Sequence, residues 1–80
     1  MGNVTVLFFG ATADAVGLRQ HEMEIAGDET VGSLASHLIE ENPRLRQKKL
    51  LFAVNEEYAD PERLLAAGDN VAVFTPVSGG

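Results

Sequence analysis

The chain has 80 residues, 45% of them hydrophobic, and a formal net charge of −6, which together predict one acidic globular domain. The negative charge argues against nucleic acid and anionic membrane surfaces as partners, because cations drive binding to phosphate groups. The absence of cysteine excludes disulfides, thiolate metal sites and nucleophilic thiols, and two histidines are too few for a histidine metal site.

Two predicted strands occupy the first part of the sequence. Residues 3–10, NVTVLFFG, are rich in β-branched and aromatic side chains and are largely apolar on both faces. We therefore expect this strand at the centre of a sheet. The stretch ATADAVG follows as a loop or short helical turn that closes at Gly17. Residues 18–25 then alternate in polarity, which predicts a half-exposed strand at a sheet edge.

One amphipathic helix is predicted in the middle of the chain. Thr30 is a favourable N-cap, and the acidic pair 28–29 lies close to the positive end of the helix. Apolar side chains then recur at the spacing of a single helical face: Val31, Leu34, Ala35, Leu38 and Ile39. Pro43 disfavours helical geometry in the residue before it, so the helix is expected to end near Asn42. His37 lies off the apolar face, and we expect it to be exposed.

The second half is expected to turn, run as a strand and return as the last strand. Four of the six basic residues lie within residues 44–49, which we interpret as a solvated turn, with phosphate or an acidic partner as the alternative. Residues 49–55, KLLFAVN, predict a third strand. Residues 60–65 predict a short helical turn whose leucines close one end of the core. A turn at residues 67–70 leads into the last strand, residues 71–75.

This order of elements predicts an α+β fold of the ubiquitin-like, β-grasp type. We expect a mixed sheet of about four to five strands with one main helix across one face. The β-grasp domain should span residues 1–75, and residues 76–80 should form a flexible tail. Because one helix covers one face, apolar residues of the other face are expected to form a partner surface, unless twist and loops cover them. The predicted members are Phe8 or Phe9, Phe52 and Phe74.

Side-chain chemistry does not predict an independent active site. The acidic pairs 28–29, 40–41 and 56–57 fall at turns or helix ends, where solvated carboxylates are ordinary. The glycines form no phosphate-binding or dinucleotide-binding motif, and no metal-ligand spacing occurs. We therefore expect no metal and no permanently bound cofactor. No apolar leader or run of transmembrane length occurs either, so we expect a cytoplasmic protein.

The C-terminal sequence FTPVSGG carries the one group with predicted reactivity. Gly79 and Gly80 have no Cβ, so their backbone can thread a narrow channel in another protein. Pro76 fixes one φ angle and reduces the entropy lost when a partner orders the tail. Attack of the Gly80 carboxylate on the α-phosphate of ATP would form an acyl-adenylate, open to a sulfur or amine nucleophile. Because cysteine is absent, an activated group would be carried as an acyl derivative of Gly80.

Several stretches resemble the small subunit of molybdopterin synthase, the MoaD family of ubiquitin-like sulfur carriers. They are VTVLFFG near the start, VN at residues 54–55 and AAGDNVAVFTPVSGG at the end. The resemblance implies that an ATP-dependent activating enzyme adenylates Gly80, which then becomes a thiocarboxylate. The tail would insert into the large subunit, which holds the pterin precursor of the molybdenum cofactor and provides the catalytic pocket. A heterotetramer of two small and two large subunits is also implied.

The resemblance assigns Gly79 and Gly80 to the chemistry. It assigns insertion into the partner to Phe74, Thr75, Pro76, Val77 and Ser78. Thr75 departs from the family, which commonly has a proline there, and its N–H and freer φ make the tail less stiff. Two alternatives share the diglycine ending. One is a ubiquitin-like modifier joined through Gly80 to lysines of other proteins, and the other is a sulfur carrier for thiamine or another pathway. A plain interaction domain with a fortuitous tail is the last alternative.

Overall fold

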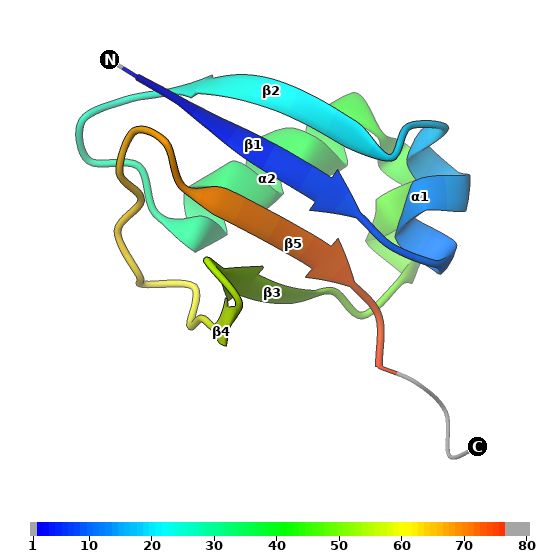
Figure 1. Cartoon of the computed structure of the whole chain (residues 1–80). Coiled ribbons are helices and arrows are strands. Elements are labelled where there is room, and N and C mark those ends of the chain that lie inside the picture. The colour runs from blue at the N-terminus through cyan, green and yellow to red at the C-terminus, as the bar shows by residue number, and fades with distance from the viewer. Residues whose placement is uncertain (1, 77–80) are drawn as a thin grey trace.

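Residues 2–76, which the computed structural model describes, form a five-stranded mixed sheet with one long helix across one face (Figure 1). The strands are β1 (Gly2–Phe8), β2 (Gln20–Ile25), β3 (Leu51–Val54), β4 (Glu57–Tyr58) and β5 (Asn70–Phe74). The helices are α1 (Ala11–Val16), α2 (Val31–Glu41) and the 3₁₀ helix η1 (Pro43–Gln47). The predicted β-grasp fold is confirmed.

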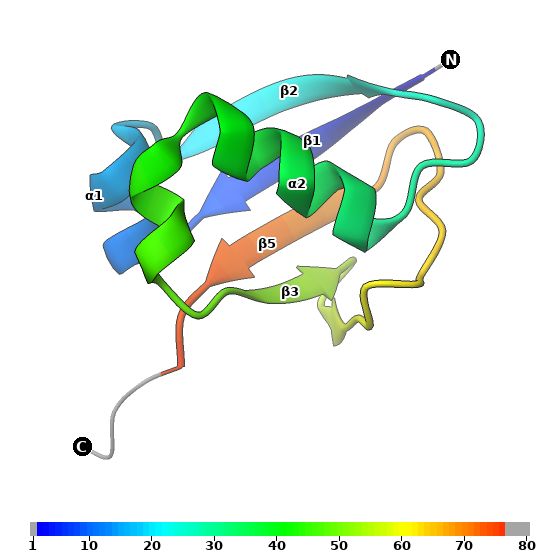
Figure 2. The ribbon, with the colours of Figure 1, turned by 180° about the vertical axis from the view of Figure 1, so that it is seen from behind.

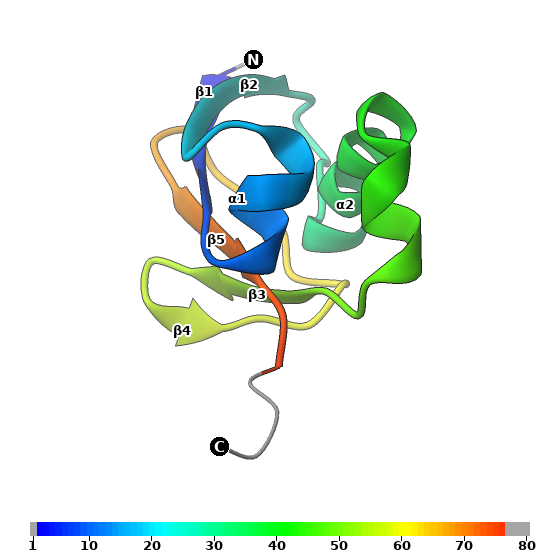
Figure 3. The same ribbon diagram turned by 90° about the vertical axis from the view of Figure 1, so that its right-hand side faces the viewer.

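The sheet order is β2-β1-β5-β3-β4, so the first and last strands of the chain lie together at its centre. Strand β5 runs parallel to β1 and antiparallel to β3, and β2 pairs antiparallel with β1 at one edge. The central position predicted for the first strand and the edge position predicted for the second are both confirmed. Figure 2 shows α2 lying across β1 and β5 on one face, and Figure 3 shows the two layers edge on.

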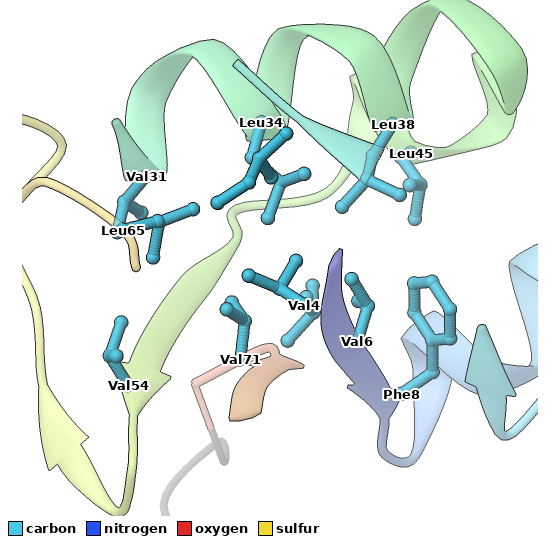
Figure 4. Packing of buried hydrophobic residues seen from close by; sticks show 12 residues of the cluster. Val4, Val6, Phe8, Val31, Leu34, Leu38, Leu45, Val54, Leu65 and Val71 are labelled. Carbon is cyan, nitrogen blue, oxygen red and sulfur yellow. The ribbon is translucent and has the colours of Figure 1, made fainter. Parts of the chain in front are cut away.

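The hydrophobic core lies between α2 and one face of the sheet (Figure 4). Helix α2 contributes the predicted apolar positions Val31, Leu34 and Leu38. Alternate strand residues point toward them because successive side chains of a strand face opposite sides. The buried strand residues are Val4, Val6, Phe8, Ile25, Val54, Val71 and Val73. Leu45 and Leu65 close the two ends of this layer (Figure 4).

Thr30 is the N-cap of α2, as predicted, and it forms a capping box with Ser33. The Ser33 N–H donates to Thr30 Oγ1 at 3.1 Å, and the Thr30 N–H donates to Ser33 Oγ at 3.0 Å. The Ser33 hydroxyl also donates to the carboxylate of Glu29, which is only 8% exposed. The Ser33 hydrogen bond lowers the pKa of Glu29, burial opposes that shift, and the Ala26 N–H and nearby His37 add to the lowering.

The segment from residue 60 to 65 differs from the prediction. It forms a turn at residues 61–62 and then an isolated bridge between Leu64 and Thr30, with no helical turn. Its backbone bonds to the chain before α2, because the Leu65 N–H donates to the Glu29 carbonyl at 2.9 Å. Leu65 is buried, but Leu64 is 64% exposed. The expectation that both leucines close the core is therefore wrong for Leu64.

Two further short elements were not predicted. Leu45 is fully buried and anchors residues 43–47 as the helix η1, where a solvated turn was expected. The basic side chains of that helix, Arg44 and Arg46, are nevertheless exposed, as expected of solvated charges. Strand β4 forms because Asn55 and Glu56 adopt positive φ angles of 51° and 73°, which make a tight turn after β3.

Replacing Ser33 by alanine tests the start of α2. Ser33→Ala should lower the free energy of unfolding by about 1 kcal/mol at pH 7, because the hydrogen bond from the Thr30 N–H to Ser33 Oγ and the hydrogen bond from Ser33 to Glu29 are both lost, whereas Thr30 Oγ1 keeps its backbone partner. A carboxylate with a lowered folded-state pKa stabilises the fold above its unfolded pKa of about 4.3, and this contribution disappears as the pH falls through the folded value. The difference between wild type and variant should therefore shrink below about pH 4. Urea unfolding at several pH values measures it.

Ser36→Ala is the matched control. Ser36 is exposed and bonds only to the Gly32 carbonyl of its own helix, at 3.2 Å. Its loss should change the free energy of unfolding by less than about 0.5 kcal/mol at every pH. Equal effects of the two substitutions would contradict the role assigned to Ser33.

Candidate functional site

The candidate site consists of the end of β5 and the sheet face that α2 leaves open. Four predicted tail residues lie outside the described residues: Val77, Ser78, Gly79 and Gly80. The described chain continues from Phe74, the last residue of β5, through half-buried Thr75 to exposed Pro76. Because β5 is the middle strand, the C-terminal segment leaves from the centre of the sheet and not from an edge (Figure 3).

Thr12 holds the end of β5 in place. Its side chain is fully buried, and its Oγ1 lies 2.8 Å from the carbonyl oxygens of Val73 and Phe9, so the hydroxyl can donate to either. Thr12 Oγ1 also accepts a hydrogen bond from the Phe9 N–H at 3.1 Å. The same Phe9 N–H donates to the Val73 carbonyl, also at 3.1 Å. Helix α1 therefore ties the ends of β1 and β5 together immediately before Phe74. Sequence analysis missed Thr12, because its partner Val73 is 61 residues away.

The open face contains only part of the predicted aromatic set. Phe8 is 3% exposed and points into the core, and Phe52 packs against the core on the same side of β3 as Val54. The expectation that these two residues belong to the open face is wrong, because they occupy the core positions of their strands. Phe9 is 52% exposed, and Phe74 alternates with buried Val73 and so faces the open side.

Strand register adds residues to this face that the sequence prediction omitted. Leu7 lies opposite Ala72, Ala72 opposite Ala53, and Ala53 opposite Tyr58, so these four side chains form one row across the sheet. Tyr58 is 80% exposed, and its ring centroid lies 5.9 Å from that of Phe74. The alternation within each strand was available in the sequence, but the pairing that aligns the rows required the fold. Figure 1 views this face, with α2 behind the sheet.

A polar network at the other end of β5 joins two of the stretches quoted for the family resemblance. Asn55 Nδ2 donates to Asp69 Oδ1 at 3.0 Å, and the Asn70 N–H donates to Asn55 Oδ1 at 3.0 Å. The Ala66 N–H donates to the second carboxylate oxygen of Asp69 at 2.8 Å. Gly68 has a φ of +89°, a value that favours glycine and allows this turn. The network fixes where β5 begins.

The remaining polar groups suggest structural roles. Ser33, Glu29 and His37 lie together. The Ser33 hydroxyl donates to the Glu29 carboxylate, and His37 Nε2 lies 3.8 Å from the same carboxylate, not next to Ser33. A serine nucleophile would need the histidine as its direct neighbour. Within residues 2–76, no three His, Asp or Glu side chains are grouped so that they could hold a metal ion. None of the helices in this range is long and apolar enough to cross a membrane.

Comparison with known proteins identifies the family of this chain. The model of the ThiS family matches residues 6–80, which is nearly the whole chain. The chain belongs to this family. The molybdopterin synthase sulfur carrier subunit of Escherichia coli is 38% identical over 82 residues, which cover 96% of this chain and 99% of that protein. The resemblance found in the sequence is therefore confirmed.

Two solved structures of family relatives extend the comparison. SAMP1 from Haloferax volcanii superposes with a TM-score of 0.85 at 31% identity, over 99% of this chain and all of that one. A protein–protein complex of subunits 1 and 2 of the molybdopterin-converting factor from Helicobacter pylori contains a chain that superposes with a TM-score of 0.70 at 25% identity. That match covers 98% of this chain and 99% of the other.

Replacing Thr12 by valine tests the connection at the end of β5. Thr12→Val keeps the side-chain shape but removes the hydroxyl, so the buried hydrogen bond to the Val73 carbonyl and one acceptor of the Phe9 N–H are lost. We expect the free energy of unfolding to fall by about 1–2 kcal/mol. The Phe9 amide, which bridges β1 and β5, should exchange with solvent faster than in wild type. Urea unfolding and amide hydrogen exchange measure the two effects.

Thr5→Val is the matched control for this prediction. Thr5 lies on the open face of β1, and its hydroxyl donates to Glu22 at 3.2 Å in an exposed hydrogen bond. The same chemical change there should alter the free energy of unfolding by less than about 0.5 kcal/mol. Unchanged exchange of the Phe9 amide in Thr12→Val would contradict the role of Thr12.

Proposed function

We propose that this chain is the sulfur carrier subunit of a molybdopterin synthase and that it carries sulfur as a thiocarboxylate of Gly80. The full-length match to the sulfur carrier subunit of Escherichia coli is the observation that carries the proposal. The Gly79-Gly80 ending agrees with it, because an α-carboxylate at the end of two glycines can enter an active site that excludes larger residues.

The chemistry belongs to Gly80 and to partner proteins. On an activating enzyme, the Gly80 carboxylate attacks the α-phosphate of ATP, which releases pyrophosphate and leaves an acyl-adenylate. A sulfur nucleophile then displaces AMP, and the product is the thiocarboxylate. ATP is thus used by the activating enzyme and is not a resident cofactor of this chain. In the synthase, the thiocarboxylate donates its sulfur to the pterin precursor in a pocket of the large subunit.

The fold supports this role as a rigid base for the tail. The last core residue before the tail, Val73, is held by Thr12 and by the backbone of β1. The four residues from 77 to 80 can span at most about 14 Å when fully extended. A partner that holds Gly80 must therefore approach within about 14 Å of Pro76. The open sheet face beside Pro76 is the surface that we propose it covers.

We further propose the large subunit of molybdopterin synthase as the partner of this face. The Helicobacter pylori complex of subunits 1 and 2 supports this choice, because one of its chains shares the fold of this protein. We also propose an assembly of two small and two large subunits in the cytoplasm, as the resemblance implies. The domain then ends near Thr75, and residues 76–80 act as the inserted tail.

A second function, as a protein modifier, is favoured by one comparison. The Haloferax volcanii SAMP1, a small archaeal modifier protein, is 31% identical to this chain over nearly its full length. The same acyl-adenylate at Gly80 could react with a lysine amine of another protein and form an amide bond. Peptides with a C-terminal tail remnant on target lysines would demonstrate this second use. Their absence from the proteome of cells that make the chain would exclude it.

Maturation of the chain tests the main proposal. Incubation with its activating enzyme, ATP and a sulfur donor should replace one oxygen by sulfur at Gly80, which intact mass spectrometry detects. Deletion of Gly80 should abolish both the mass change and the formation of molybdopterin by the reconstituted synthase. The physical reason is that the shortened chain ends in the carboxylate of Gly79, which falls one residue, about 3.5 Å, short of the two active sites.

Ser36→Ala provides the control, because it changes an exposed side chain of α2 and keeps the whole C-terminal tail. It should leave the mass change intact and lower the rate of molybdopterin formation by no more than about threefold, a loss of less than about 1 kcal/mol. Molybdopterin formation by a chain that lacks Gly80 would contradict the proposed function.

A further inference from the structure

The open sheet face contains a hollow of about 410 Å³, and its floor is made of two alanines. Ala72 of β5 and Ala53 of β3 lie directly opposite each other, and bulkier Leu7 and Tyr58 stand at the two ends of their row. Phe9 forms another wall of the hollow. Two small side chains between larger ones leave a depression wide enough for one long side chain of a partner.

The end of the hollow next to the β3–β4 turn is polar and acidic. Asn55, Glu56 and Asn70 line it. The Asn55 amide is already bonded to Asp69 and to the Asn70 backbone. Glu56 is exposed, and it makes no ion pair with any other residue of the described range 2–76. It is the one charged residue among the described residues that line this hollow.

We propose that an arginine of the large subunit occupies this hollow and pairs with Glu56. Its aliphatic stem would lie over Ala53 and Ala72, and its guanidinium would reach the carboxylate, since long cationic side chains place their carbons on apolar surfaces. Arginine fits better than lysine, because its guanidinium is less strongly hydrated and is common at the centres of interfaces. The net charge of −6 complements a basic partner. The inference rests on the proposed function, which identifies the large subunit as the partner.

The position of the hollow relative to the tail supports this occupant. Ala72 lies four residues before Pro76 on the same strand, a distance of about 13 Å at about 3.3 Å per residue. An ordinary protein interface buries about 800 Å² on each partner, which corresponds to a patch about 30 Å across. A large subunit that holds the tail and covers the open face therefore reaches the hollow with an interface of ordinary size.

Glu56→Gln tests whether the negative charge of Glu56 contributes to binding, and Glu57→Gln is its matched control. The two residues are adjacent and undergo the same change, but Glu57 lies opposite Val54 on the other face, where it is 79% exposed and 3.8 Å from Arg63. Binding of the full chain to the purified large subunit is measured by titration calorimetry. Glu56→Gln should raise the Kd about tenfold, and Glu57→Gln less than about twofold. Equal effects of the two changes would overturn the proposal.

The shape of the hollow is tested at Ala72. Ala72→Leu fills the hollow from its floor and should raise the Kd at least about tenfold, whereas Ala72→Ser keeps the space and should change it less than about threefold. Circular dichroism and thermal unfolding verify that both variants are folded. A folded Ala72→Leu chain that binds as tightly as wild type would show that no side chain enters the hollow, and would overturn the proposal.

The identity of the occupant is tested on the large subunit. Each of its surface arginines and lysines is changed to methionine, and each variant is titrated with the wild-type chain and with Glu56→Gln. Substitution of one particular arginine should weaken binding to the wild-type chain about tenfold. The same substitution should have little further effect on binding to the Glu56→Gln chain, which is the signature of a direct pair. Coupling to a lysine alone, or to no cation, would overturn the proposal. Wild-type chain that fails to bind the large subunit would instead refute the proposed function.

Discussion

The pairing of β5 between β1 and β3 is the interaction on which the rest of this structure depends. It joins the two ends of the chain in the middle of one sheet and places Val71 and Val73 in the core. Because β5 runs parallel to β1, its C-terminal end lies beside the end of β1, where α1 begins. The C-terminal segment therefore leaves from the centre of the sheet.

Two polar arrangements define the ends of that central strand. At its start, Asn55 and Asp69 link the β3–β4 turn to the turn that precedes β5. At its end, the buried Thr12 hydroxyl links β5 to β1. The buried hydrogen bond of Thr12 adds about 1 kcal/mol to stability and also fixes geometry, since an unpaired buried polar atom is costly. The hydrogen bonds of Asn55 and Asp69 are exposed, and their main effect is to fix the geometry of the two turns. The strand that carries the tail is consequently set in register at both ends.

The two faces of the sheet differ, because one packs against α2 in the core and the other is open. A single long helix, capped by Thr30 and Ser33, covers one face and provides Val31, Leu34 and Leu38 to the core, while Leu45 and Leu65 come from other segments. Within residues 2–76, no helix lies over the other face (Figure 1). That face bears Phe74, Tyr58 and a hollow over two alanines. This arrangement agrees with the proposed function, in which the C-terminus would be the reactive group, the partner would supply the active site and this face would supply a shaped surface beside it.

The sequence by itself determined the local elements and the nature of the C-terminal group. Alternation identified the strands, the spacing of Val31, Leu34 and Leu38 identified α2, and Thr30 located its start, because these signals arise from neighbouring residues. The tertiary structure alone decided which face of each strand lies inside. Phe8 and Phe52 therefore proved to be core residues. Contacts between distant segments, such as Thr12 with Val73, were also decided there, because strand pairing brings together residues whose sequence gives no sign of their partners.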